Sequence, residues 1–154
     1  MKRILIYIAI LLAVVLVPLE RTDVGELRPV QTVAVYRDGK AYVIATDTGD
    51  QGKGKTVPDA LTDLKQTTPA VIYLDTAQFL LTGKDADDAV EELRQHFRSA
   101  VELYSFRGDA DLEAVSKYLT VHGNGPKLKH WHPGGKLPVL VCAGEQIKLV
   151  ENTK

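Results

Sequence analysis

The chain has few of the residues from which small proteins build covalent or metal cross-links. Its 154 residues include a single cysteine, Cys142, and four histidines. One cysteine excludes a disulfide within the chain, and one thiol with four imidazoles leaves little material for a structural zinc site. We therefore expect neither kind of cross-link.

An excess of charge of either sign is also missing. Lysine and arginine number 19 against 20 aspartates and glutamates, for a formal net charge of −1. Without a basic excess there is no electrostatic basis for binding nucleic acid. The 45% hydrophobic and 25% charged residues are the proportions of one ordinary globular domain. They exclude a disordered tail, a collagen-like fibre and a multidomain enzyme.

Charged residues are absent from the stretch Ile4 to Leu19, which follows Lys2 and Arg3. A helix over this stretch would be about 24 Å long, at roughly 1.5 Å per residue, against the roughly 30 Å hydrocarbon core of a bilayer. We interpret residues 1–19 as a membrane segment, with residues 4–19 in contact with lipid. The small residues of a signal-peptide cleavage site are missing from Val15–Glu20, which favours an uncleaved anchor. A cleaved signal peptide stays the alternative.

The basic pair before the apolar run predicts the topology. Because positive charges stay on the cytoplasmic side, the N-terminus should be cytoplasmic and the rest of the chain extracytoplasmic. The sequence predicts a polar tether over residues 20–27 and one folded domain over residues 28–154. This would be a single-pass protein of the cell membrane.

Hydrophobic periodicity predicts a mixed sheet with helices packed on it. An Asp-Gly turn between Val30–Tyr36 and Lys40–Thr46 indicates a hairpin. A polar, Gly-rich loop over Asp47–Lys55 should follow. The further strands are expected at Ala70–Asp75, Phe79–Leu81, Val101–Phe106, Leu128–His132, Leu137–Ala143 and Gln146–Leu149. The helices are expected from Pro58 to Thr67, over Asp85–Phe97, and from an N-cap at Asp109 to His122.

This order of elements indicates an α+β or mixed α/β domain. It would have about six or seven strands in a mixed sheet with three helices, preceded by one N-terminal membrane helix.

One segment matches the phosphate-binding pattern G-x-x-x-x-G-K-[ST]. It runs from Gly49 through Gly54 and Lys55 to Thr56, and Asp75 follows an apolar strand as a metal-binding aspartate would. Against a phosphate site, the preceding strand belongs to a tight antiparallel hairpin, and Pro58 disfavours helical geometry at Val57. The expected location is also poor in nucleoside triphosphate. A phosphate- or nucleotide-binding domain is therefore the alternative function.

Histidines and a lone acid supply the remaining candidates. His130 and His132 flank Trp131, so on a strand both imidazoles would share one face, as metal ligands do. No carboxylate or cysteine partner stands at a suitable spacing, so they are weak metal candidates. Asp75 within an apolar run is a conceivable acid or base without a visible partner. No catalytic residues, cofactor or metal are therefore assigned.

A family resemblance adds to this interpretation. The segment Leu27–His122 resembles the N-terminal domain of the Ger(x)C spore-germination family, the membrane-associated C subunits of bacterial germinant receptors. The resemblance rests on the opening hairpin Val30–Thr46, the Gly-rich loop with Thr56, and a short helix through Ala60 and Leu64. It continues through the run Ile72–Gly83 and the acidic helix Asp85–Phe97.

The chain departs from that family in three ways. Family members usually carry a lipid-modified cysteine after the signal sequence and continue into further domains, and they often have histidine where Asp75 stands. The resemblance implies a non-enzymatic accessory role outside the membrane of a spore-forming bacterium, with a protein partner at the membrane. The sequence thus favours a membrane-anchored extracytoplasmic interaction domain, linked to sporulation or spore germination.

Overall fold

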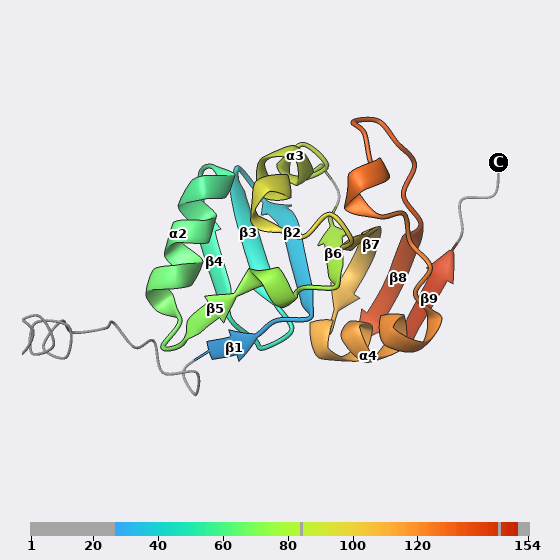
Figure 1. The fold of residues 1–154 in the computed structure, drawn as a ribbon, viewed down its shortest axis with the longest axis horizontal. Coiled ribbons are helices and arrows are strands. Elements are labelled where there is room, and N and C mark those ends of the chain that lie inside the picture. The colour runs from blue at the N-terminus through green and yellow to red at the C-terminus, as the bar shows by residue number, and fades with distance from the viewer. Residues whose placement is uncertain (1–26, 84, 145, 151–154) are drawn as a thin grey trace, which may run out of the picture.

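The computed structural model describes residues 27–83, 85–144 and 146–150 (Figure 1). Within these residues no helix is both long and apolar enough to cross a bilayer. The expected membrane segment at residues 1–19 and most of the expected tether lie outside the described residues.

Seven strands form one mixed sheet, in the spatial order β4-β3-β2-β6-β7-β8-β9. The central strands β2, β6, β7 and β8 run parallel, whereas β3, β4 and β9 are antiparallel to their neighbours. A separate sheet pairs β1 with β5 in parallel. The strands are β1 (Leu27–Pro29), β2 (Thr32–Asp38), β3 (Ala41–Thr46), β4 (Gln51–Gly54), β5 (Val71–Tyr73), β6 (Phe79–Thr82), β7 (Glu102–Ala110), β8 (Val139–Gly144) and β9 (Gln146–Val150).

Three α-helices accompany the sheet in the described part of the chain, which confirms the expected mixed sheet with three helices. They are α2 (Val57–Thr67), α3 (Ala89–Leu93) and α4 (Leu112–His122). The described residues also contain three 3₁₀ helices: η2 (Leu74–Thr76), η3 (Arg94–His96) and η4 (Leu128–His130).

The helices divide between the two faces of the sheet. On one face, α2 and α3 pack with Val33, Val35, Leu80 and Leu103 in the larger core. On the other face, α4 packs with Ala34, Leu81, Tyr104 and Leu140. Because alternate residues of a strand point to opposite faces, each central strand contributes to both cores. The chain therefore reverses the face of its connections between β6, which leads to α3, and β7, which leads to α4.

The local signals for the hairpin and the first helix are confirmed. Asp38 pairs with Ala41 across the turn, where Gly39 has a φ of 64°. Such a left-handed conformation favours glycine. The hydroxyl of Thr56 accepts a hydrogen bond from the Asp59 amide (3.3 Å) as the N-cap of α2.

Several expected boundaries were wrong. The strand at Ala70–Asp75 is only β5 and lies outside the main sheet. Asp85 has a φ of 61°, so a helix cannot run from it, and the helical part of Asp85–Phe97 begins at α3. The N-cap of α4 is Asp111, whose Oδ1 accepts from the Glu113 amide (3.0 Å), because β7 stays paired with β8 as far as Ala110.

Two further expectations failed where the chain folds against a neighbour. Gln51–Gly54 forms strand β4 beside β3 instead of lying in a loop. The segment Leu128–His132 is not a strand but contains η4, in which the His130 amide donates to the Lys127 carbonyl (2.9 Å). The C-terminal hairpin of β8 and β9 is confirmed.

One buried hydroxyl gives a prediction for stability. Thr32 is fully buried, and its Oγ1 has no hydrogen-bond partner in the described part of the chain. Thr32→Val removes this unsatisfied oxygen and keeps the branched shape. We expect it to raise the free energy of unfolding by about 1 kcal/mol, measured by urea denaturation.

The matched control is Thr46→Val. The Thr46 hydroxyl is buried too, but it lies 2.7 Å from the Thr48 hydroxyl and donates to the Asp50 carbonyl (3.1 Å). Its loss should destabilise the protein by about 1 kcal/mol. Equal effects of the two substitutions would contradict the conclusion that the Thr32 hydroxyl is unsatisfied.

Candidate functional site

The segment that matches the phosphate-binding pattern does not form a phosphate-binding loop. Gly49 lies in the turn before β4, and Gly54 ends that strand, which is antiparallel to β3. The Lys53 amide donates to Oδ2 of Asp63 (2.8 Å), and Lys55 is exposed. An extended strand does not gather its amides around one anion, as a P-loop does.

The glycines of this segment have a packing role. A Cβ atom on Gly52 would lie 2.3 Å from the Ala60 carbonyl oxygen, and one on Gly54 would lie 2.3 Å from the Ala60 amide. Both glycines therefore let α2 approach β4 closely. Thr56 serves as the N-cap of α2.

Asp75 lies in η2 and is exposed. Because β5 pairs with β1 and not with the main sheet, Asp75 does not follow a strand next to β4 or β2, as a metal-binding aspartate of a P-loop fold would. The arrangement that the sequence pattern suggested is therefore not formed.

His130 and His132 do not share a strand face. His130 ends η4, and Nδ1 of His132 lies 3.4 Å from the His130 carbonyl oxygen. Trp131 between them is buried in the larger core, 7% exposed. No group of three or more potential metal ligands occurs among residues 27–83, 85–144 and 146–150.

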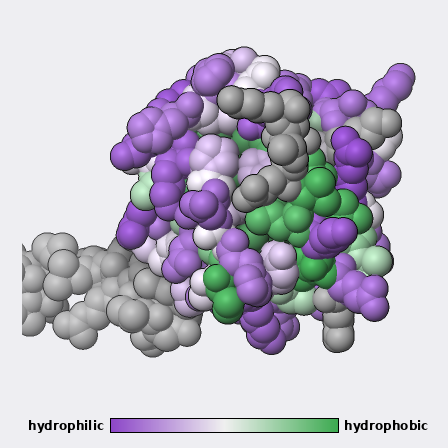
Figure 2. All heavy atoms as spheres, turned by 90° about the vertical axis from the view of Figure 1, so that its right-hand side faces the viewer, coloured by the Kyte–Doolittle hydropathy of each residue, from purple (hydrophilic) through white to green (hydrophobic). Residues whose placement is uncertain are grey.

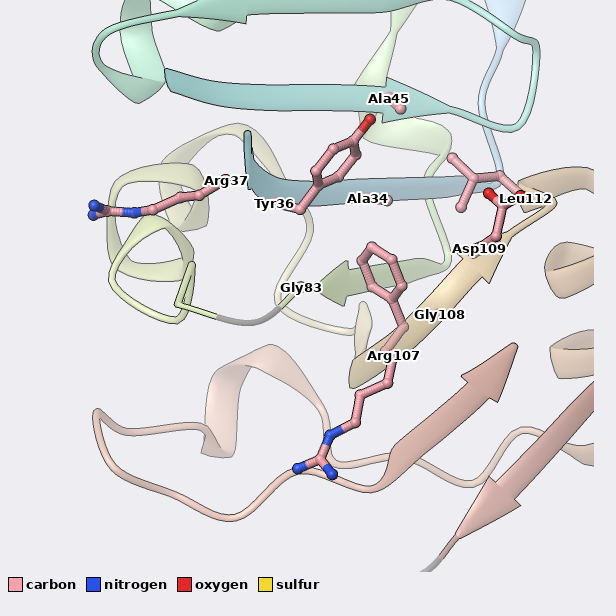
Figure 3. A pocket seen from close by; sticks show the side chains of 11 residues that line it. Ala34, Tyr36, Arg37, Ala45, Gly83, Arg107, Gly108, Asp109 and Leu112 are labelled. Carbon is pink, nitrogen blue, oxygen red and sulfur yellow. The ribbon is translucent and has the colours of Figure 1, made fainter. Parts of the chain in front are cut away.

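The structure instead forms a cavity of about 540 Å³ on one face of the sheet, bordered by β2, the end of β6 and the carboxyl half of β7. The cavity opens on the face of the sheet that carries α4, which covers that face only in part (Figure 3).

Two aromatic rings form the wall of this cavity. Tyr36 of β2 and Phe106 of β7 meet edge to face, with ring centroids 6.1 Å apart and an interplanar angle of 89°. Both rings are half-exposed. Small side chains and glycine backbone leave the space beside the two rings, and Leu112 borders it at the start of α4. The small residues are Ala34, Ala45, Gly83, Gly108 and Ala110.

Two of these glycines are required by close contacts. A Cβ atom on Gly83 would lie 2.5 Å from Cβ of Tyr36, so any side chain there would displace the tyrosine. Gly108 has a φ of 93°, and a Cβ atom there would lie 2.0 Å from the Cys142 carbonyl oxygen. These glycines therefore set the shape of the cavity.

The two arginines at the rim turn away from the cavity. Arg37 and Arg107 extend outward from β2 and β7 (Figure 3). Arg37 binds Asp88 (2.6 Å) and stacks on the ring of Tyr42, 4.4 Å from its centroid. The Tyr42 hydroxyl also donates to the Asp88 carboxylate, which raises the pKa of Tyr42. This cluster ties the β2–β3 hairpin to the segment before α3.

The polar groups left at the cavity are few. In the described part of the chain, neither the Tyr36 hydroxyl nor the Asp109 carboxylate has a hydrogen-bond partner. The cavity thus offers an apolar, aromatic wall with a phenol and one acid at its edge. It is suited to hold an apolar or aromatic group and to fix it by a few polar contacts.

A second apolar area lies over the edge of β8 and β9, on the side shown in Figure 2. Val141 and Val150 are 44% and 40% exposed. Lys148 pairs with Val141 and so shares its face of the sheet. A lysine in an edge strand opposes pairing with another strand, so this edge is a weaker candidate for docking than the cavity.

Sequence reasoning missed Tyr36 and Phe106. Each stands at an ordinary position in a strand, and 70 residues separate them in the sequence. They meet only through the strand order β2-β6-β7, in which Val35, Thr82 and Ser105 stand side by side just before them.

Comparisons with protein-family models, curated proteins and solved structures find no match for this chain.

Proposed function

We propose that the chain is a membrane-anchored, extracytoplasmic interaction domain without catalytic activity. Residues 4–19 would cross the membrane with the N-terminus in the cytoplasm. The domain would bind a membrane protein partner by receiving an apolar or aromatic side chain in the cavity beside Tyr36 and Phe106.

The composition of the cavity wall is the observation that carries this proposal. Half-exposed aromatic rings beside alanine and glycine give a recess that can bury a side chain at small conformational cost. The two arginines at the rim extend outward, so an apolar group can enter without stripping water from a guanidinium.

The resemblance to the Ger(x)C family supports an accessory role in sporulation or spore germination. The chain has the hairpin of β2 and β3, then helix α2, then strand β6 and the acidic segment that contains α3. These elements follow one another in the order on which the resemblance rests. In place of a lipid-modified cysteine, residues 4–19 would hold the chain in the membrane.

Site-specific photocrosslinking in the cells that make the protein tests this proposal. We expect the full chain with benzoylphenylalanine at position 36 to form one discrete adduct, recovered with the membranes. Ala45→Leu, which fills the cavity from β3, should abolish the adduct because the partner's side chain no longer fits. The melting temperature of the variant checks that it still folds.

The control probe stands at Lys40, in the exposed hairpin turn outside the cavity lining. It should give no such adduct. If the adduct at position 36 is absent, or persists unchanged in the filled variant, the cavity is not the binding site.

A further inference from the structure

The small sheet of β1 and β5 carries exposed apolar residues. Val71 and Tyr73 are 46% and 43% exposed, whereas Ile72 between them is 8% exposed and belongs to the larger core. Pro29 pairs with Tyr73 and is exposed as well. Because alternate residues share a face, Pro29, Val71 and Tyr73 form one outward surface, which we call the β5 face.

This surface lies close to the N-terminal apolar run along the chain. The run ends at Leu19 and β1 begins at Leu27, so seven residues, 20–26, connect them. Seven residues span at most about 25 Å when fully extended. The interfacial layer on each side of the hydrocarbon core takes up roughly 6 Å of that length. With the run in a bilayer, β1 must therefore stay within a short distance of the lipid headgroups.

The β5 face is fixed to the body of the domain. The Thr76 hydroxyl accepts a hydrogen bond from the Val30 amide (3.0 Å) and lies 2.8 Å from the Tyr73 carbonyl oxygen, to which it can donate. Ile72 and Leu74, on either side of Tyr73, are buried. The β5 face therefore has a fixed orientation relative to the main sheet.

The chemistry of the β5 face suits a lipid interface. None of its three side chains carries a charge that would have to be dehydrated. Arg28, which pairs with Ile72, alternates to the other side of β1 and binds Asp50 (3.3 Å). Tyrosine is enriched where a membrane meets water, since its ring is apolar and its hydroxyl stays hydrated.

We infer that the β5 face, formed by Pro29, Val71 and Tyr73, rests on the surface of the membrane that holds the N-terminal anchor. This inference rests on the proposed function, because it requires the anchor.

The contact would orient the cavity. β2 follows β1 after Val30 and Gln31, and it runs from Thr32 to the cavity residue Tyr36 at its carboxyl end. Ile72 of β5 packs in the larger core, on the face of the main sheet opposite to the one on which the cavity opens. The cavity would then be presented to a partner and not to the bilayer.

A fluorescent probe on the full chain in liposomes tests the contact. Val71→Cys, labelled with nitrobenzoxadiazole, keeps Tyr73 in place. The natural Cys142 is buried, and burial raises the pKa of its thiol, so it should remain unlabelled. In phosphatidylcholine vesicles we expect blue-shifted emission from position 71 and severalfold stronger quenching by a lipid-borne quencher than from a Lys40→Cys control. Lys40 lies in the turn at the opposite end of β2.

The outcomes separate the two proposals. If carbonate extracts the chain from the vesicles, the anchor and the proposed function fail. If the chain stays in the vesicles but positions 71 and 40 are quenched equally or not at all, only the lipid contact is overturned. A third result would be a blue shift at position 71 that grows with the protein-to-lipid ratio and is not quenched by the lipid-borne quencher. The β5 face would then contact a second copy of the chain, which also overturns the inference.

Discussion

Gly52→Ala should lower the free energy of unfolding by about 3 kcal/mol or more, the largest effect that we expect from one added methyl group. A Cβ atom at this position would meet the Ala60 carbonyl oxygen and the Leu64 amide nitrogen, each at 2.3 Å. Both are backbone atoms of α2, so no side-chain rotation can relieve the overlap. The helix must move away from β4, which opens the larger core at Leu61 and Leu64. Thermal or urea denaturation measures the loss.

The control is the same substitution at Gly49, three residues earlier. Gly49 has a φ of 84° and nothing within 4 Å of an added Cβ atom. Gly49→Ala should therefore cost only about 1 kcal/mol, the price of a left-handed conformation. Equal effects of the two substitutions would contradict the close contact between α2 and β4. Residues 49–56 would then be free to form a phosphate-binding loop.

Glu102→Ala should destabilise the protein by about 2–3 kcal/mol, because the buried Tyr104 hydroxyl and the Lys127 ammonium lose their acceptor. The Lys127 ammonium donates to Oε1 (2.7 Å), and the Tyr104 hydroxyl donates to Oε2 (2.8 Å). The Gly125 amide donates to Oε2 at 3.3 Å and, more closely, to the Tyr104 hydroxyl at 2.7 Å. Tyr104 is fully buried, so its hydroxyl cannot turn to water for a replacement acceptor. Urea denaturation gives the difference.

The control is an exposed ion pair. Lys53 binds Asp38 at 2.6 Å, but both side chains are more than half exposed. Lys53→Ala should change the stability by no more than about 0.5 kcal/mol. A comparable loss in both variants would mean that the Glu102 network contributes no more than a surface pair.

The same carboxylate predicts a dependence on pH. Burial raises the pKa of Glu102, but the hydrogen bonds from Lys127, Tyr104 and Gly125 outweigh burial and hold the pKa below its ordinary value of 4.5. A depressed pKa means that the stabilisation is present above pH 4.5 and is lost as the pH falls through the lower, folded-state value. Because glutamine does not titrate, Glu102→Gln should lose less stability than the natural chain as the pH falls below 4.5, measured by acid denaturation.

Local signals in the sequence predicted the elements that depend on their nearest neighbours. The Asp-Gly turn after Arg37 and the cap at Thr56 act within four residues, so the hairpin and α2 could be placed. Strand β4 could not be placed, because only the packing of α2 on it explains why glycines stand in a strand. A run such as Val71–Tyr73 has strand composition whichever sheet it joins. Its pairing with β1 is a tertiary result.

The candidate site depended even more on tertiary structure. The pattern around Gly54 and Lys55 is local, and it wrongly suggested a phosphate site. Its glycines instead allow α2 to pack closely against β4. Tyr36 and Phe106 carry no motif, and only the order β2-β6-β7 brings them together. The neighbours of Glu102 are likewise separated from it, since Gly125 and Lys127 follow α4. A single sequence does not reveal such pairs.

The order of strands also fixes how the sheet can be assembled during synthesis. From β2 onward, β6, β7, β8 and β9 are added one after another at the same edge, in the order in which they leave the ribosome. Until Val139–Gly144 have emerged, the outer edge of β7 from Ser105 to Ala110 lacks the strand with which it pairs. Unpaired edges of this kind promote aggregation of incomplete chains. Chains cut short before β8 should therefore depend on chaperones, whereas those that end after β9 should not.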